Sequence, residues 1–401
     1  VIDSIYGGVV VAPRDESPTA SVVDFRANRF VLEGRPYFLF GTNHTGEVWF
    51  SPLDNPAVWR HDLRWMRDHG LRVLRVLHFS PFAARGYEGV RQHSSLDLKV
   101  PPPPRLVDET DALLHACQKE GVVLFLSLHD WLEEELTDEE LKAQREWNRF
   151  WASRYAKEPG IIFDIQNEPH IGIPQTPEMQ VLWNEYLRKT YGTDEALKAA
   201  WKESPPEASL GAVPLNDTPD SWSNVRRLDV NLFRTELLKR WIAENAAGIK
   251  EGNPKALATV GFLPDYQSAE KLLSLEHQDF ANMHYYGPVD RFPASLKLSD
   301  RRFEGKSFTL GEFGAQEAHD ARVKGQEGLF VEPSVDRYIT VAHEALGMGA
   351  GFILNWCLKD MPDCEFQWGL TYRQDGVDKD WAKVYRNTAL FTSFLRPFDR
   401  Q

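Results

Sequence analysis

The sequence has few cysteines and no long apolar run, and both absences exclude classes of protein. Its three cysteines are too few for a disulfide framework, and none has the spacing of a zinc site. We expect Cys117 to be a small core residue, and the sequence leaves open whether Cys357 and Cys364 pair. No apolar run reaches about 18 residues, so we predict no transmembrane helix and no membrane partner.

The sequence also lacks an excess of positive charge. Lys and Arg number 46 against 59 Asp and Glu, a net charge of −13, and without a basic stripe we expect no nucleic-acid partner. The N-terminal VIDSIYGGVV has no signal-peptide pattern, but the chain does not begin with Met, so a secreted and a cytoplasmic location both stay open. Aromatic residues are abundant, with 13 Trp, 12 Tyr and 23 Phe, whose rings pack in cores or stack on sugar faces.

Eight short apolar runs recur along the chain, and longer segments with helical signals lie between them. The runs are residues 37–41, 71–77, 122–128, 161–166, 257–262, 280–284, 307–311 and 351–356. Continuously apolar strands that alternate with helices indicate a parallel sheet buried on both faces. We therefore predict an α/β fold, a closed (β/α)8 TIM barrel, with an open doubly wound sheet as the alternative.

Two additions decorate this barrel, and residues 1–401 are predicted to form a single catalytic domain. Residues 22–36 indicate an N-terminal β-hairpin with a turn at Glu33-Gly34. The helical stretch at about 174–231 is longer than one strand–helix unit requires, and we predict that it is an insertion after the fourth strand. The expected helices include residues 55–69, 137–155, 183–191, 195–201 and 228–249.

Two glutamates follow apolar runs where a barrel builds its active site. Glu168 lies in an Asn-Glu-Pro motif after the fourth run, and Glu312 in Gly-Glu-Phe after the seventh. Either alone also fits a structural interpretation, because Asn caps a following segment and Pro stops a strand. Together they match glycoside cleavage, in which a protonated carboxyl donates to the leaving oxygen and an ionised carboxylate attacks the anomeric carbon.

Other strand ends supply residues that fit the same reaction. Arg75 could keep Glu312 ionised, although a buried guanidinium can also form a structural ion pair with another acid. Tyr286 could donate to the nucleophile and Asn167 to a sugar 2-hydroxyl, whereas His129 alone is as well explained as a core residue. The candidate substrate-binding residues are Arg75, His129, Asn167, His284, Tyr286, Trp356, Asn43 and His44.

This ordered set resembles clan A glycoside hydrolases, most of all family 5, the cellulase-like family. That family has Arg after strand two, His after three, Asn-Glu after four, His-x-Tyr after six, Glu after seven and Trp after eight. The positions are filled in order by Arg75, His129, Asn167-Glu168, His284-Tyr285-Tyr286, Glu312 and Trp356. The similarity spans residues 24–395.

The resemblance implies a retaining β-glycoside hydrolase with Glu168 as general acid/base and Glu312 as nucleophile. It implies an oligo- or polysaccharide substrate and neither a metal nor an organic cofactor. We expect a β-1,4-linked glucoside or mannoside. The sequence sets no oligomeric state.

Residues 174–231 depart from compact cellulases, because WNEYLRKTYGTDEALKAAW resembles clan A β-galactosidases. A β-galactosidase-like or other exo-acting enzyme is therefore the alternative. Trp183, Trp201 and Trp222 could stack on sugars there, but we favour packing within the insertion.

Two alternatives come from other classes. A metal-dependent barrel hydrolase would use strand-end ligands such as His129, Asp130 and His284. A non-catalytic sugar-binding barrel would not need both glutamates.

Overall fold

The computed structural model describes residues 23–26, 29–32, 35–36, 38–45, 56–77, 96, 98–130, 136–169, 173–202, 209–215, 224–263, 274–299, 306–315, 334–360, 368–371 and 378–394. Eight parallel strands close into a barrel in the order β10-β11-β4-β5-β6-β7-β8-β9. They are β4 (Leu39–Thr45), β5 (Val73–Leu77), β6 (Val123–Asp130), β7 (Ile161–Asn167), β8 (Ala258–Phe262), β9 (Ala281–Tyr285), β10 (Phe308–Phe313) and β11 (Phe352–Asn355). Each overlaps one predicted run, so the TIM barrel is confirmed and the open sheet is excluded.

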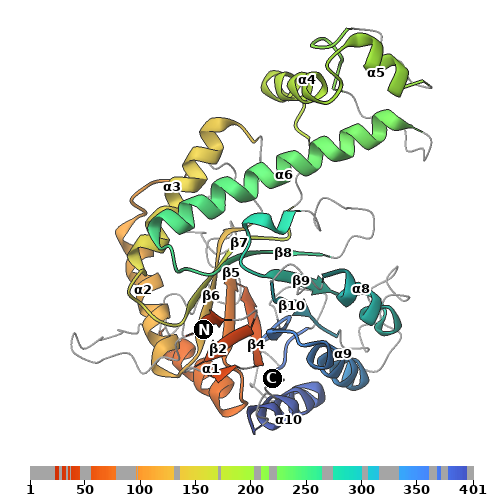
Figure 1. Cartoon of the computed structure of the whole chain (residues 1–401). Coiled ribbons are helices and arrows are strands. Elements are labelled where there is room, and N and C mark those ends of the chain that lie inside the picture. Colours follow the sequence, from red (N-terminus) through yellow and green to blue (C-terminus); the bar gives the residue numbers. More distant parts are fainter. Residues whose placement is uncertain are drawn as a thin grey trace, which may run out of the picture.

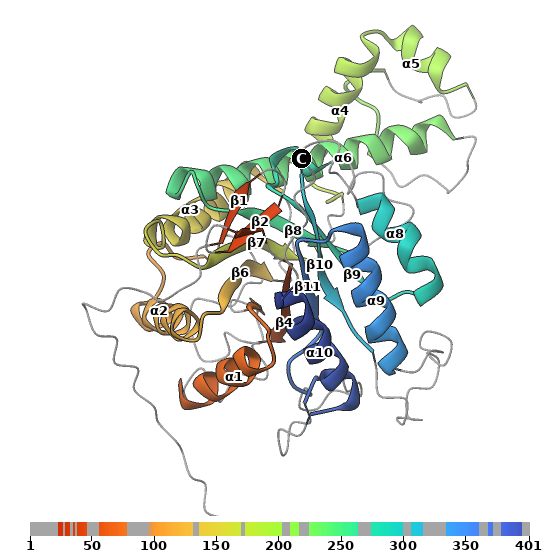
Figure 2. The same cartoon turned by 60° about the horizontal axis from the view of Figure 1, so that its bottom comes forward.

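Helices surround the barrel (Figures 1 and 2). Those outside the predicted insertion are α1 (Pro56–Asp68), α2 (Pro104–Lys119), α3 (Asp138–Arg154), α8 (Phe292–Ser299), α9 (Ser334–Met348) and α10 (Asp380–Phe394), with the 3-10 turns η3 (Ser274–His277) and η4 (Val289–Arg291). Proline opens α1 and α2, where its missing N–H would have had no helical partner. A capping box opens α3: the Thr137 hydroxyl accepts from the Glu140 N–H at 3.2 Å, and the Glu140 carboxylate accepts from the Thr137 N–H at 3.1 Å.

The N-terminal segment folds into a three-stranded antiparallel sheet rather than the single predicted hairpin. Its strands are β1 (Val23–Arg26), β2 (Arg29–Leu32) and β3 (Arg35–Pro36). The chain also reverses between Arg26 and Arg29, and two residues are the shortest common hairpin connection. Phe30 of β2 is fully buried, with its ring 5.0 Å from that of Phe280 and 5.4 Å from that of Phe352. The sheet therefore plugs the amino-terminal end of the barrel.

Inward-facing side chains form layers along the barrel axis. The layer at the amino ends of the strands is apolar and consists of Phe30, Leu39, Val73, Val123, Phe125, Ile162, Phe280, Phe352 and Leu354. Further towards the carboxyl ends, the buried positions turn polar at Arg75, Ser127, Asp164, Asn282 and Thr309. Polar side chains inside a barrel need hydrogen-bond partners there, so this layer is where a site can be built.

The predicted insertion forms a helical arm that extends away from the barrel (Figure 1). The arm consists of α4 (Pro177–Tyr191), α5 (Asp194–Ala200) and the first half of α6 (Val225–Gly252). Trp183 and Trp201 are at most 1% exposed, with ring centroids 6.4 Å apart. The packing role favoured for these two tryptophans is confirmed, and Trp222 lies outside the described residues.

Helix α6 joins the arm to the barrel without a break over 28 residues. Its second half packs against α3 so closely that a Cβ on Gly248 would lie 2.4 Å from the carbonyl oxygen of Arg145. The insertion boundary drawn at residue 231 falls inside this helix. One helix therefore serves both the barrel wall and the arm.

The remaining sequence expectations concern cysteines and membranes. Cys117 and Cys357 are both buried, Cys117 is a free thiol, and Cys364 lies outside the described residues. Burial raises the pKa of the Cys117 thiol, as expected for a core residue. Among the helices described, none is long and apolar enough to cross a bilayer.

Candidate active site

Arg75 lies at the centre of a buried polar cluster in the barrel. Its Nη1 donates to Glu312 Oε1 at 2.6 Å and to Asn43 Oδ1 at 2.9 Å, and its Nη2 donates to Asn167 Oδ1 at 2.8 Å. Nε and Nη2 also donate to Asp164 Oδ2, at 2.9 and 2.5 Å. All five guanidinium hydrogens thus have acceptors. Both sequence interpretations of Arg75 therefore hold, since it pairs with Glu312 and with a second acid.

That second acid, Asp164, is a site residue that the sequence analysis missed. It is fully buried in β7, and its Oδ1 accepts from the Gly261 N–H at 3.3 Å. Burial raises the pKa of Asp164, and the adjacent Arg75 opposes this shift. Because both carboxylate oxygens face N–H donors, the surroundings satisfy the ionised form. The available signal was an acid within the apolar run IIFDIQ, which needs a buried partner.

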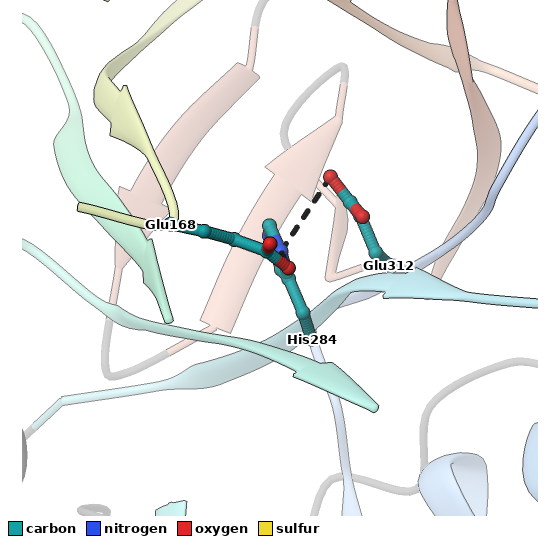
Figure 3. A group of neighbouring side chains, drawn as sticks. All are labelled: Glu168, His284 and Glu312. Carbon is teal, nitrogen blue, oxygen red and sulfur yellow. Dashed lines mark hydrogen bonds and ion pairs between the residues drawn. The ribbon is translucent and has the colours of Figure 1, made fainter. Parts of the chain in front are cut away.

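Glu168 brings a further carboxyl group to the cluster, and the imidazole of His284 lies beside it. Glu168 follows β7 with φ of 45°, a left-handed conformation that is uncommon for residues with a side chain. His284 Nδ1 lies 2.8 Å from Glu168 Oε1 and 3.5 Å from Glu312 Oε1. Figure 3 shows the two glutamates reaching towards the imidazole. Gly261 leaves room for this ring, because a Cβ there would lie 2.4 Å from His284 Nε2.

The surroundings of the two glutamates differ. The side chain of Glu168 is 25% exposed and that of Glu312 is 5% exposed. The Tyr286 hydroxyl donates to Glu312 Oε2 at 2.7 Å, and burial raises the pKa of that hydroxyl well above its usual value, so it remains a donor. Burial lowers the pKa of His284 to about 4, so the imidazole is neutral near pH 7.

The pKa of Glu312 reflects opposing influences. Burial raises it, and the neighbouring Glu168 carboxylate acts in the same direction. Arg75 and the Tyr286 hydroxyl oppose the rise, because both stabilise the ionised carboxylate. Glu312 is thus a desolvated carboxyl group that two donors hold in a fixed orientation.

Asn43 and Asn167 both turn their side-chain oxygens towards Arg75. Asn43 also donates from Nδ2 to the carbonyl oxygens of Gly311 at 2.8 Å and Asn355 at 3.0 Å. Its amide group is therefore engaged within the barrel. Because Arg offers only donors, the oxygen of Asn167 must face Arg75, which directs its Nδ2 group elsewhere as a donor.

His129 takes part in a different polar network. Its Nε2 lies 2.8 Å from Asn148 Oδ1, and Asn148 Nδ2 in turn donates to Asn245 Oδ1 at 2.7 Å. Asn245 Nδ2 donates to Gln144 Oε1 at 2.6 Å, so the network extends between α3 and α6. Burial lowers the pKa of His129 to about 4. These contacts fit the core interpretation, and the predicted contact of His129 with substrate stays a prediction.

Two tryptophans lie close to the cluster. Trp356, which is half-buried, directly follows β11, and its backbone N–H donates to the Phe313 carbonyl oxygen at 2.7 Å. Trp368 packs edge-on against Tyr286 with ring centroids 5.4 Å apart. Trp368 follows no predicted strand, so it was not among the predicted site residues. His44 is buried in β4, opposite Val76.

Glu168, His284 and Glu312 have N and O atoms within 4.8 Å of one another, a spacing that could also hold a cation. However, the Arg75 guanidinium already faces Glu312 as a positive charge. The metal alternative also needed His129, which is bonded to Asn148, and Asp130, whose side chain lies outside the described residues. The donor set therefore fits acid–base chemistry better than metal binding.

Family models match two overlapping parts of the chain. A model described as cellulase (glycosyl hydrolase family 5) matches residues 31–203, and one described as beta-galactosidase (Glyco_hydro_42) matches residues 135–304. The resemblance to family 5 is thereby confirmed. No curated protein sequence matches the chain.

Solved structures share the fold at low sequence identity. The β-galactosidase from the psychrophilic Marinomonas ef1 has a TM-score of 0.68 and 15% identity, over 89% of this chain and 60% of that one. The β-galactosidase from the haloarchaeon Halorubrum lacusprofundi has a TM-score of 0.69 and 17% identity, over 89% and 58%. A GH5_18 protein from Streptomyces cattleya in complex with Manβ1-4GlcNAc has a TM-score of 0.56 and 15% identity, over 88% and 80%.

The chain spans 58–60% of the length of these two β-galactosidases. At such identities the structural likeness shows the fold alone. The two family models, each over less than half of the chain, make the chain similar to families 5 and 42 of the clan A glycoside hydrolases.

Proposed function

We propose that this glycoside hydrolase cleaves β-linked glucosides or mannosides, with β-1,4 linkages preferred, by double displacement with net retention. Glu168 is the general acid/base and Glu312 the nucleophile. One observation carries the proposal: two carboxyl groups have oxygens within 4.8 Å of each other, while Arg75 and Tyr286 both donate to Glu312. Such closeness is typical of retention, because inversion needs room for a water between the groups.

The first step uses each carboxyl group once. Glu312 attacks the anomeric carbon while the glycosidic C–O bond breaks, and Glu168 gives its proton to the leaving oxygen. The products are a free alcohol, an α-glycosyl ester on Glu312 and an ionised Glu168. Because its side chain is 25% exposed against 5% for Glu312, Glu168 can meet both the leaving group and solvent, whereas Glu312 is fixed by its donors.

The second step reverses these roles. Glu168 removes a proton from a water molecule whose oxygen attacks the anomeric carbon, and the ester bond to Glu312 breaks. Arg75 and Tyr286 stabilise the carboxylate as it leaves. Two inversions give a product with the β-configuration of the substrate.

The remaining predicted residues are assigned to the sugar or to its supports. Asn167 donates from Nδ2 to the sugar 2-hydroxyl, because Arg75 holds its oxygen. Trp356 forms the floor of the subsite, and His44 and His129 line it. Asn43 acts through Arg75, since its amide group is already engaged.

A β-galactosidase-like exo activity is the second candidate. It is favoured by the beta-galactosidase model over residues 135–304, which include the helical arm. A hydrolysis panel of β-mannan, β-glucan, xylan and aryl β-glucoside, β-mannoside and β-galactoside separates the candidates. Release of single galactose units would replace the gluco/manno assignment.

Product stereochemistry tests the mechanism. In a proton NMR time course with an aryl β-glycoside we expect the β-anomer first, and an α-anomer would overturn retention. Glu168→Ala with azide should yield a β-glycosyl azide, because azide then replaces water in the second step. Glu312→Gly with azide should yield the α-azide, because azide then takes the place of the nucleophile. Activity of the wild type should survive a chelator, which the metal alternative does not allow.

A further inference from the structure

We propose that Asp164 is a positioning residue that supplies Arg75 with a permanent counterion, so that Glu312 can lose its charge when the glycosyl-enzyme forms. The inference rests on the double-displacement function proposed above and adds one residue to it.

Asp164 and Glu312 bind opposite edges of one guanidinium. Asp164 Oδ2 accepts from Nε and Nη2 at 2.9 and 2.5 Å, and Glu312 Oε1 accepts from Nη1 at 2.6 Å. The Arg75 and Asp164 side chains are fully buried and that of Glu312 is 5% exposed. Interactions between these charges are therefore only weakly screened by solvent.

The charge balance of the cluster changes during the reaction. In the free enzyme one positive group, Arg75, faces two carboxylates, Asp164 and Glu312. Once Glu312 is an ester, Arg75 would be a buried cation without a partner if Asp164 were neutral. With Asp164 ionised, the intermediate holds one balanced pair, and an unpaired buried charge is avoided.

The same arrangement sets how readily Glu312 ionises. Glu312 is faced by Arg75 from β5, by His284 and Tyr286 at the end of β9 and by Glu168 after β7, and Asp164 lies behind Arg75. A negative charge behind the guanidinium weakens its hold on Glu312, which leaves the nucleophile more basic and more reactive. Asp164 therefore prevents Arg75 from stabilising the resting carboxylate too strongly.

Asp164→Asn, which removes the charge and preserves the size, makes these effects measurable. We expect the acidic limb of the pH profile of kcat/KM, which reports the ionisation of Glu312, to move about one unit to lower pH. The pKa of Glu312 should fall because a negative charge near it is lost. Formation of the glycosyl-enzyme should slow by about tenfold or more, and its hydrolysis should be unchanged or faster. A loss of packing alone would reduce the amount of active enzyme and leave the limb in place.

The two steps are measured separately with a 2,4-dinitrophenyl 2-deoxy-2-fluoro-β-glycoside of the sugar that the wild type hydrolyses. Its inactivation rate reports glycosylation, and recovery of activity after its removal reports hydrolysis of the ester. Asp360→Asn is the matched control, because it breaks another buried pair, Lys379 Nζ to Asp360 Oδ1 at 2.6 Å. The control should lower stability without moving the limb or the ratio of the two rates.

Asp164→Glu keeps the charge and serves if the asparagine variant does not fold. We expect its acidic limb to stay at the wild-type pH even where the rate falls. An unmoved limb in Asp164→Asn, or a limb in Asp164→Glu moved by a full unit to lower pH, overturns the inference. Mass spectrometry of the trapped wild type separates this from failure of the proposed function, which would leave Glu312 unlabelled.

Discussion

The two ends of the barrel are built on the same strands with opposite kinds of side chain. At the amino ends, the rings of Phe30, Phe125, Phe280 and Phe352 pack with centroids 5.0–6.4 Å apart. Towards the carboxyl ends, Arg75 makes five hydrogen bonds to carboxylate and amide oxygens.

The difference separates stability from chemistry along the barrel axis. The apolar layer removes rings from water without polar cost, and it stabilises the fold. The charged cluster must hold acids whose pKa burial has raised, and such a site opposes folding at neutral pH. Substitutions in the charged cluster should therefore lower activity without lowering stability, and substitutions in the apolar layer should lower stability without lowering activity.

The largest effect is expected for Glu312→Gln. Loss of the nucleophile should lower kcat/KM by about 10⁵-fold. Stability at pH 7 should stay level or rise: burial raises the folded-state pKa above its unfolded value of 4.5, so the ionised form is disfavoured in the folded state at higher pH. Steady-state kinetics and urea unfolding measure the two quantities. If a stable Glu312→Gln variant kept a tenth of the wild-type activity, catalysis and stability would not be divided between the two ends of the barrel as proposed.

At the other end, Phe280→Ala should have the reverse signature. Removing a ring from the fully buried phenylalanine layer should cost about 3–5 kcal/mol of unfolding free energy. Activity per folded molecule should stay within about threefold, because no contact with the glutamates is lost. Phe280→Leu, which keeps more of the volume, is the matched variant and should cost less. A large fall in kcat with normal stability would show that the two layers are coupled.

Tyr286→Phe should have a smaller effect on rate. Without the hydroxyl that donates to Glu312 Oε2, kcat should fall by about 10- to 100-fold. The acidic limb of kcat/KM should move to higher pH, because a donor that lowers the pKa of Glu312 is lost. This shift is opposite to the one expected for Asp164→Asn.

Tyr338→Phe is the control for the loss of a buried hydroxyl. That hydroxyl accepts from Asn355 Nδ2 at 3.4 Å. We expect Tyr338→Phe to leave the pH profile of kcat/KM unchanged. An equal shift in both variants would contradict a specific role for Tyr286.

Most of the fold was predictable from the sequence, because a strand buried on both faces leaves a continuous apolar run. All eight barrel strands overlap the predicted runs. The boundary of the insertion was harder to place. Within α6 the apolar pattern that packs on α3 continues into the arm, so nothing marks the point where the helix leaves the barrel.

The site was predictable where polar residues end apolar strands. Glu168, His284, Tyr286 and Glu312 meet as the order of strands implied. Asp164 was not predicted, because it lies inside β7 and the predicted site residues were those at strand ends. The contact of His129 with Asn148 on α3 was beyond the sequence, because a strand-end position does not say which way an imidazole turns.

The smallest effect concerns His129, whose hydrogen bond to Asn148 belongs to neither the apolar layer nor the charged cluster around Arg75. The pKa of His129 is about 4 in the folded protein and 6.5 in the unfolded chain. Below pH 6.5 the unfolded chain therefore binds more protons than the folded protein, and the free energy of unfolding decreases as the pH is lowered. Over 1.5 units, from pH 6.5 to 5.0, this group alone removes about 2 kcal/mol. His129→Gln should therefore show a loss between pH 7.5 and 5.0 that is smaller than the wild type's by about that amount, measured by urea unfolding. His277→Gln, at an exposed histidine, is the surface control. If His129→Gln loses as much stability as the wild type, another buried group whose pKa is lowered, such as His284, sets the acid sensitivity of the protein.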